Sequence, residues 1–156
     1  MYNLIVKEAD FSDVKHTDAI LKLTDAYASD PMGLGRPLSD STRQKLTDEL
    51  RKFPGSICFI AFLDGEVAGL ANCFYSFSTF SASRIINLHD LAVLSEYRGK
   101  GIGSALLDAV EKKAREENCS KITLEVRHDN RARNLYERAG FSYGETLMYF
   151  MSKSLE

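Results

Sequence analysis

The chain contains no tryptophan, few prolines and only three cysteines, and it has no long run of apolar residues. Cys58, Cys73 and Cys119 lack the C-x-x-C spacing of zinc and redox motifs, and an odd number cannot all pair within one chain. We therefore expect reduced, partly buried thiols, as in a cytoplasmic protein, and no metal site. No stretch approaches the roughly 18 apolar residues of a membrane span, and residues 1–8 lack the apolar region of a signal peptide. The sequence predicts a soluble protein located inside the cell.

An excess of charge of either sign is also missing. The 20 Lys and Arg residues and the 22 Asp and Glu residues leave a formal charge of -2. Such a balance gives no overall attraction to nucleic acid or to an anionic membrane, and we expect neither as a partner. With 156 residues, of which 44% are hydrophobic, the chain has enough apolar material for one core. We expect a single domain over residues 1–156.

Hydrophobic periodicity predicts alternating strands and helices. Asp64-Gly65 tolerates positive φ and favours a tight hairpin between two of the strands. The amphipathic helix that begins at 102 would let the strands on either side of it run parallel. The fold class is therefore α/β (α+β), a single mixed and mostly antiparallel sheet with helices on both faces. The expected strands are 2–7, 57–63, 66–77, 84–93, 121–126 and 146–151, and the expected helices are 10–28, 39–53, 102–116 and 131–139.

A glycine-rich turn precedes the helix at 102. Gly99, Gly101 and Gly103 remove Cβ atoms where backbone N–H groups must approach a ligand, next to a helix N-terminus that attracts anions. Arg98 and Lys100 add positive charge beside the turn. The pattern fits neither the P-loop nor the dinucleotide fingerprint. It predicts a pyrophosphate-binding nest, with an ordinary strand-to-helix loop as the alternative.

Two ordered motifs resemble one known family. Arg98-x-x-Gly101-x-Gly103 matches the (Gln or Arg)-x-x-Gly-x-(Gly or Ala) signature of the GNAT superfamily. Residues 130–141, which end in Leu-Tyr-x-x-x-Gly-Phe, resemble a second segment of that superfamily. The resemblance covers essentially the whole chain and implies the GNAT fold and an N-acetyltransferase that uses acetyl-CoA as cosubstrate. Residues 74–77 and 87–91 are, more weakly, similar to diamine and polyamine acetyltransferases.

The resemblance also implies where CoA binds. The backbone of residues 98–104, which includes Ile102 and ends at Ser104, would bind the pyrophosphate. The backbone of Leu91 and Val93 would hold pantetheine as a neighbouring strand does, and an N–H group near Leu91 or Ala92 would stabilise the oxyanion. Asn130 is predicted to hydrogen-bond the cofactor, to cap a helix, or both.

Catalysis requires a proton acceptor, because an amine attacks a thioester only as the free base. His89 is the first candidate for a base or water relay, with a structural or substrate-positioning role as the alternative. Strand alternation predicts that His89 shares a face with Asn87 and Leu91 while Asp90 points the other way. By resemblance, Tyr136 would protonate the departing CoA thiolate; its alternative role is packing.

The acceptor is less well defined by the sequence. Asn87 stands where some GNAT enzymes carry a glutamate base, and an amide cannot act as one. Asp90 could hold a cationic substrate or serve a structural role, and an aromatic segment over residues 74–80 could line an acceptor pocket or pack in a core or dimer interface. We expect a primary amine on a small cationic metabolite, with peptide N-termini, lysines and antibiotics still open. The alternatives are a non-catalytic CoA-binding or sensory domain and a purely structural module; the family resemblance also suggests a homodimer.

Overall fold

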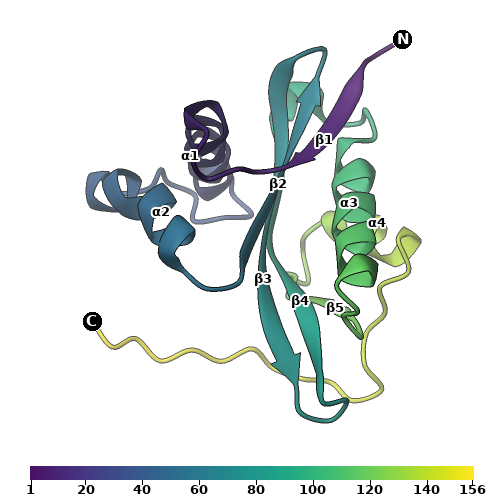
Figure 1. Cartoon of the computed structure of the whole chain (residues 1–156). Helices are drawn as coiled ribbons and strands as arrows, with labels where there is room; N and C mark the ends of the chain where they lie inside the picture. Colours follow the sequence, from purple (N-terminus) through teal and green to yellow (C-terminus); the bar gives the residue numbers. More distant parts are fainter.

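A computed structural model describes all residues from 1 to 156 (Figure 1). The elements follow the predicted order as far as the last helix. They are β1 (Leu4–Glu8), α1 (Val14–Ser29), α2 (Asp40–Lys52), β2 (Ser56–Leu63), β3 (Glu66–Ser78), β4 (Ser83–Val93), a 3-10 turn (Ser95–Tyr97), α3 (Ile102–Glu116), β5 (Ile122–Leu124) and α4 (Ala132–Arg138).

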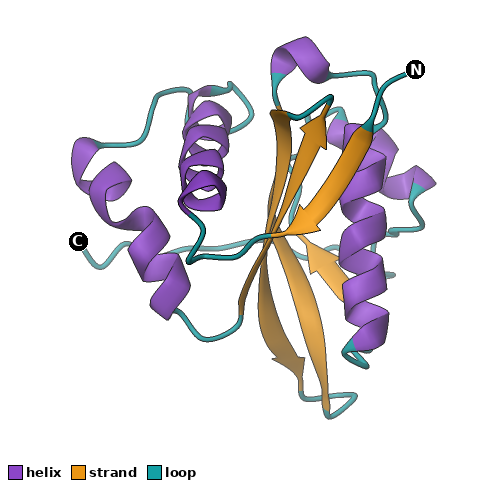
Figure 2. Cartoon of the chain, turned by 45° about the horizontal axis from the view of Figure 1, so that its top comes forward, coloured by secondary structure: helices purple, strands orange, loops and turns teal.

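One five-stranded sheet, in the order β1-β2-β3-β4-β5, forms the centre of the molecule. The first four strands pair antiparallel, and β4 pairs with β5 in parallel, as the crossover through α3 predicted. Helices α1 and α2 lie on one face of the sheet and α3 and α4 on the other (Figure 2). The predicted α/β fold class is confirmed.

Local hydrogen bonds explain where α1 and α2 begin. Asp13 caps α1 by accepting a hydrogen bond from the Lys15 amide at 2.8 Å, so the helix begins at Val14 rather than at 10. Ser39 caps α2 in the same way by accepting from the Thr42 amide at 3.2 Å. At the β2–β3 turn, Asp64 and Gly65 both have positive φ, as expected for a tight hairpin.

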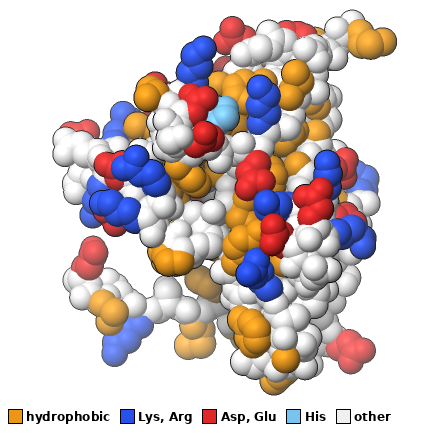
Figure 3. All heavy atoms as spheres, in the orientation of Figure 1, with side chains coloured by type: hydrophobic (Ala, Val, Ile, Leu, Met, Phe, Trp, Pro, Cys, Tyr) orange, Lys and Arg blue, Asp and Glu red, His pale blue; other side chains and the backbone are white.

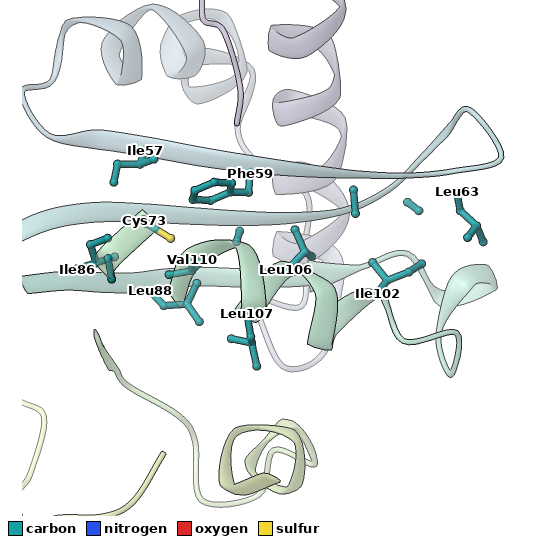
Figure 4. Close-up of a cluster of buried hydrophobic side chains, with 14 residues drawn as sticks. Ile57, Phe59, Leu63, Cys73, Ile86, Leu88, Ile102, Leu106, Leu107 and Val110 are labelled. Atoms are coloured by element: carbon teal, nitrogen blue, oxygen red, sulfur yellow. The ribbon is translucent and has the colours of Figure 1, made fainter. Parts of the chain in front are cut away.

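Two apolar clusters fill the two sides of the sheet. The larger lies between the sheet and α3, where Leu106 and Val110 are fully buried against Ile86 and Leu88 of β4 (Figure 4). The smaller lies under α1 and includes Leu23. Because α3 is fixed on the sheet along its whole apolar face, its N-terminus is held rigidly beside the end of β4.

The strand predicted at 146–151 is wrong. Residues 141–156 form no helix or strand, and no backbone hydrogen bond involves residues 142–156. The side chains of residues 147–151 are between 76% and 87% exposed. A strand needs a paired edge as well as strand propensity, and the tail turns away from β5 toward the side of α1 and α2 (Figures 1 and 3).

No helix is both long enough and apolar enough to cross a membrane.

Candidate acyl-CoA site

The glycine turn leaves a row of free amides at the start of α3. Gly99 has a φ of 76° and Gly101 a φ of 78°, which is the left-handed conformation that glycine adopts without strain. The amides of Gly99, Lys100 and Gly101 donate to no protein acceptor, and the first-turn amides of a helix have no intrahelical partner. A Cβ atom built on Gly99 or Gly101 would meet no atom within 4 Å. The turn therefore has both the donors and the space that a pyrophosphate needs.

The two cationic side chains of the turn contact protein groups. The Arg98 guanidinium pairs with Asp30 at 2.8 Å and donates through Nε to the Val93 carbonyl at 3.2 Å. The Lys100 ammonium lies over the rings of Tyr2 and Tyr97, at 4.9 Å and 5.4 Å. Arg98 thus ties the loop after α1 to the glycine turn, and the backbone supplies the free donors of the site.

The end of β4 offers a second set of backbone groups. The last parallel pair joins Leu88 and Leu124, so residues 89–93 continue past β5 without a partner strand on that side. This free edge contains Leu91, Ala92 and Val93, the positions predicted to hold pantetheine. It leads directly to the glycine turn, so a long ligand with a pyrophosphate can lie along both.

Helix α4 brings the second sequence motif to the same place. A Cβ atom on Gly103 would lie 2.8 Å from Leu135 Cδ2, so the absence of a side chain at Gly103 allows α4 to pack closely on α3. Tyr136 is the next residue of α4, and its ring lies 5.9 Å from that of Phe141. The two motifs that are far apart in sequence therefore meet at the N-terminus of α3.

Tyr136 is a neutral hydrogen-bond donor in this environment. Burial, with a smaller effect of Tyr27, raises the pKa of Tyr136 to about 12. The phenol therefore stays protonated throughout the neutral range. Asn130 accepts a hydrogen bond from the Ala132 amide at 2.9 Å, in the turn that leads into α4, whose N-cap residue is Arg131. The role of Asn130 as a ligand for the cofactor stays a prediction.

A β-bulge changes the predicted orientations on β4. The pairing with β3 shifts between Asn72 and Cys73, which leaves His89 as the extra residue and pairs Asp90 with Asn72. Asp90 then faces α1, where Asn72 Nδ2 donates to its carboxylate at 3.1 Å, and Leu91 packs on the core under α3. The prediction that Asp90 points away from the face of Asn87 and that Leu91 shares that face is wrong, because a bulge interrupts strict alternation.

The same face carries a row of aromatic rings. The ring of Phe74 lies 5.4 Å from His89 and 5.6 Å from Phe53, both edge to face. Phe74 lies directly opposite Asn87 in the sheet. Phe74 thus lines this face, whereas Phe77 and Phe80 of the predicted aromatic segment are exposed at the far end of the hairpin.

Next to this row, a cavity of about 580 Å³ opens between α2 and strands β3, β4 and β5. Its apolar wall consists of Leu46, Leu50, Phe53 and Phe74, and Tyr75 borders it while its side chain packs on the α3 side. Its polar wall consists of Glu49, Ser76, Asn87, Thr123 and Glu125.

Sequence reasoning missed Glu125 and Asp30, and it missed the contact that holds Asp90. Glu125 follows β5 and accepts hydrogen bonds from Asn87 Nδ2 at 3.2 Å and 3.3 Å. Asp30 holds Arg98, and Asn72, the one buried polar side chain, holds Asp90. None of these contacts joins residues close in sequence, so no local motif indicates them.

A strand that continues past its parallel neighbour, followed by a glycine turn with free amides and a buried helix, has the shape and the donors that a long, phosphate-containing ligand requires. The model of the acetyltransferase (GNAT) family matches residues 21–141. The chain therefore belongs to the acetyltransferase (GNAT) family.

A sequence relative and two solved structures agree with this assignment. Over 87 residues the chain is 39% identical to the uncharacterized N-acetyltransferase YhfO of Bacillus subtilis (strain 168), and the match covers 55% of this chain and 58% of YhfO. A crystal structure of a probable acetyltransferase is 27% identical, with a TM-score of 0.80 over 97% of this chain and 99% of that one. The aminoglycoside N-acetyltransferase AAC(6')-Iy, solved with CoA, shares the fold at 16% identity, with a TM-score of 0.77 over 99% of this chain and 97% of that one.

Proposed function

We propose that the protein transfers an acetyl group from acetyl-CoA to a primary amine on a small cationic metabolite, by direct attack on the thioester. The observation that carries the proposal is the row of unpaired amides at Gly99, Lys100 and Gly101, beside the free edge of β4. These two features fit the pyrophosphate and the pantetheine arm of one CoA molecule. Family membership supports the reaction class.

In the proposed reaction, the amine nitrogen forms a bond to the thioester carbonyl carbon and the carbon–sulfur bond then breaks. A backbone N–H near Leu91 or Ala92 stabilises the oxyanion between these steps. Tyr136 faces the sulfur as negative charge develops there. Because an alkyl thiol has a pKa of about 8.5, proton transfer from a phenol with a pKa of about 12 is uphill. We therefore infer that Tyr136 acts mainly by donating a hydrogen bond to the thiolate.

Asn87 and Asp90 are the proposed acceptor contacts, and His89 is the proposed relay for the proton of the amine. Asp90 is held in place by Asn72, and His89 by the ring of Phe74. All three proposed residues lie on the side of the sheet that carries α1 and α2. The amine would therefore enter from that side, opposite α3.

The test is a thiol-release assay with acetyl-CoA and a panel of primary amines, polyamines, aminoglycosides and peptides. We expect amine-dependent release of CoA, with acetylated amine as product. Binding of acetyl-CoA without release in the presence of any amine would instead indicate a non-catalytic CoA-binding domain. Release only with peptides would indicate a protein or peptide N-acetyltransferase.

We also propose that two copies associate through the C-terminal tail. The exposed side chains of residues 147–151 form one apolar run, and their backbone groups have no partner. Strand β5 pairs only with β4, so its other edge is free. A solvent-exposed run of this kind favours association, and the tail of a second copy could add a strand at that edge.

Replacing Leu147 and Phe150 by lysine should convert a dimer into a monomer, because two charges would be buried at the contact. The measurement is light scattering after size-exclusion chromatography. Phe80→Lys is the control, since Phe80 is fully exposed on the β3–β4 turn and the change should leave the dimer intact. A wild-type protein that is monomeric at every concentration tested would contradict the proposal.

A further inference from the structure

The contact between Asn87 and Glu125 places a carboxylate beside the β4 position at which some GNAT enzymes carry a glutamate base. Asn87 itself cannot accept a proton. Its side-chain amide nitrogen lies 3.2 Å and 3.3 Å from the two carboxylate oxygens of Glu125. Both residues line the cavity between α2 and β3–β5. The carboxylate therefore comes from the neighbouring strand rather than from β4.

The position of Glu125 connects the cavity with the thioester. In the parallel register, Leu88 pairs with Leu124, so Glu125 lies level with the first residue of the free β4 edge. The pantetheine arm is expected along that edge. An amine held at Glu125 would therefore lie between the apolar cavity and the reactive end of the cofactor.

The charges around Glu125 favour a cationic ligand. Glu125 forms no ion pair with any Lys, Arg or His. No cationic side chain lines the cavity, whereas a second carboxylate, that of Glu49, does; it is paired with Lys52 at 3.4 Å. Asn87 Oδ1 makes no hydrogen bond, so it can accept one from an ammonium group beside the Glu125 carboxylate.

The remaining wall of the cavity is apolar. Leu46 and Leu50 of α2 and Phe53 at its C-terminal cap line it together with Phe74 of β3. An alkyl or aryl group fits such a wall, whereas a second ammonium group would lose its hydration there. The one further carboxylate of the cavity, that of Glu49, is already paired with Lys52. The cavity thus favours an amine with one charged end and one apolar body.

From this arrangement we propose that the cavity is the acceptor site and that Glu125, held by Asn87, binds the ammonium and takes its proton. The inference rests on the proposed acetyl transfer. The ammonium gives one proton to the Glu125 carboxylate, and the free nitrogen bonds to the thioester carbon. The carbon–sulfur bond then breaks, the nitrogen loses its second proton to the leaving thiolate, and Glu125 returns its proton to solvent through His89, the proposed relay. The products are the acetamide and CoA thiol.

The experiment compares variants with acetyl-CoA and phenethylamine, a primary amine with an apolar body. Glu125→Gln keeps the shape of the side chain but cannot take the proton, so we expect kcat/KM for the amine to fall about 100-fold. The dissociation constant of acetyl-CoA should change less than about twofold, because Glu125 lies outside the glycine turn. Glu116→Gln is the control, an exposed carboxylate of α3 that pairs with Lys112 outside the cavity, and its kcat/KM should stay within about threefold of wild type.

An exchange of the two side chains tests the carboxylate itself. Glu125→Asn should lower kcat/KM as Glu125→Gln does. Adding Asn87→Glu to Glu125→Asn should raise kcat/KM at least about tenfold above that of Glu125→Asn alone, because a carboxylate is then present on β4. A purely structural role for Glu125 predicts no such recovery. Phenethylamine should also be acetylated more efficiently than spermidine.

The outcomes separate the two proposals. A wild-type protein that acetylates neither amine nor any member of the wider panel would overturn the proposed function. A wild-type protein that acetylates phenethylamine while Glu125→Gln retains full kcat/KM would overturn the role of Glu125 alone. A preference for spermidine would overturn the apolar acceptor class.

Discussion

Gly101→Glu should weaken acetyl-CoA binding about 100-fold or more, because the proposed pyrophosphate site is built from backbone amides at this position. A hydrogen bond to a charged group is worth about 1.5–3 kcal/mol, and a side chain at Gly101 would displace at least two of them. The space next to Gly101 is open, so the new carboxylate would occupy the place of the phosphates and repel them. Isothermal titration with acetyl-CoA measures the loss.

Gly65→Glu provides the control for backbone strain. Gly65 also has a positive φ, of 87°, and a Cβ atom there would also meet nothing within 4 Å. Both variants therefore carry a strain of about 1–2 kcal/mol, but Gly65 lies in the β2–β3 turn. Gly65→Glu should bind acetyl-CoA as wild type does. If the two variants bound acetyl-CoA with equal affinity, the glycine turn would not be part of the binding site.

Tyr136→Phe should lower kcat about 100-fold while the affinity for acetyl-CoA stays within about threefold of wild type. The ring remains and still packs against Phe141, so the fold around α4 should be preserved. The lost group is the phenol, whose raised pKa of about 12 keeps it a donor at neutral pH. Steady-state kinetics with the best amine of the panel, together with titration of acetyl-CoA, measures both quantities.

Tyr143→Phe is the matched control for this change. The Tyr143 hydroxyl donates to Glu137 at 3.0 Å and accepts from Arg133 at 2.6 Å, and its side chain is largely exposed. Removing it should leave kcat within about twofold of wild type, because exposed hydrogen bonds contribute little. Full turnover by Tyr136→Phe would leave Tyr136 with only a packing role.

Most of the fold follows from local patterns in the sequence. The period of α3 and the Asp64-Gly65 turn act within a few residues, and the elements they predict are present. The caps Asp13 and Ser39, which fix where α1 and α2 begin, are local too. The predicted strand at 146–151 is absent because strand formation depends on a partner edge, which no local pattern specifies. The bulge at His89 has the same origin, since it is a property of the β3–β4 pairing.

In the candidate site, too, some residues belong to local sequence motifs and others meet only through the fold. The glycine turn and Tyr136 lie within contiguous motifs, and the structure brings them together through the contact of Gly103 with Leu135. The pair of Arg98 with Asp30 and that of Asn87 with Glu125 join residues far apart in sequence. The residues of the proposed cofactor side therefore lie within local motifs, whereas Glu125 on the proposed acceptor side is found only from the three-dimensional arrangement.

The central claim is that the chain moves an acetyl group from CoA to an amine nitrogen. Incubation with acetyl-CoA carrying an isotopic label in the acetyl group, followed by mass spectrometry of the amine panel, tests it most directly. We predict that one amine gains a single labelled acetyl group on nitrogen, in step with the release of CoA thiol. Tight binding of acetyl-CoA with no label on any amine would contradict the claim.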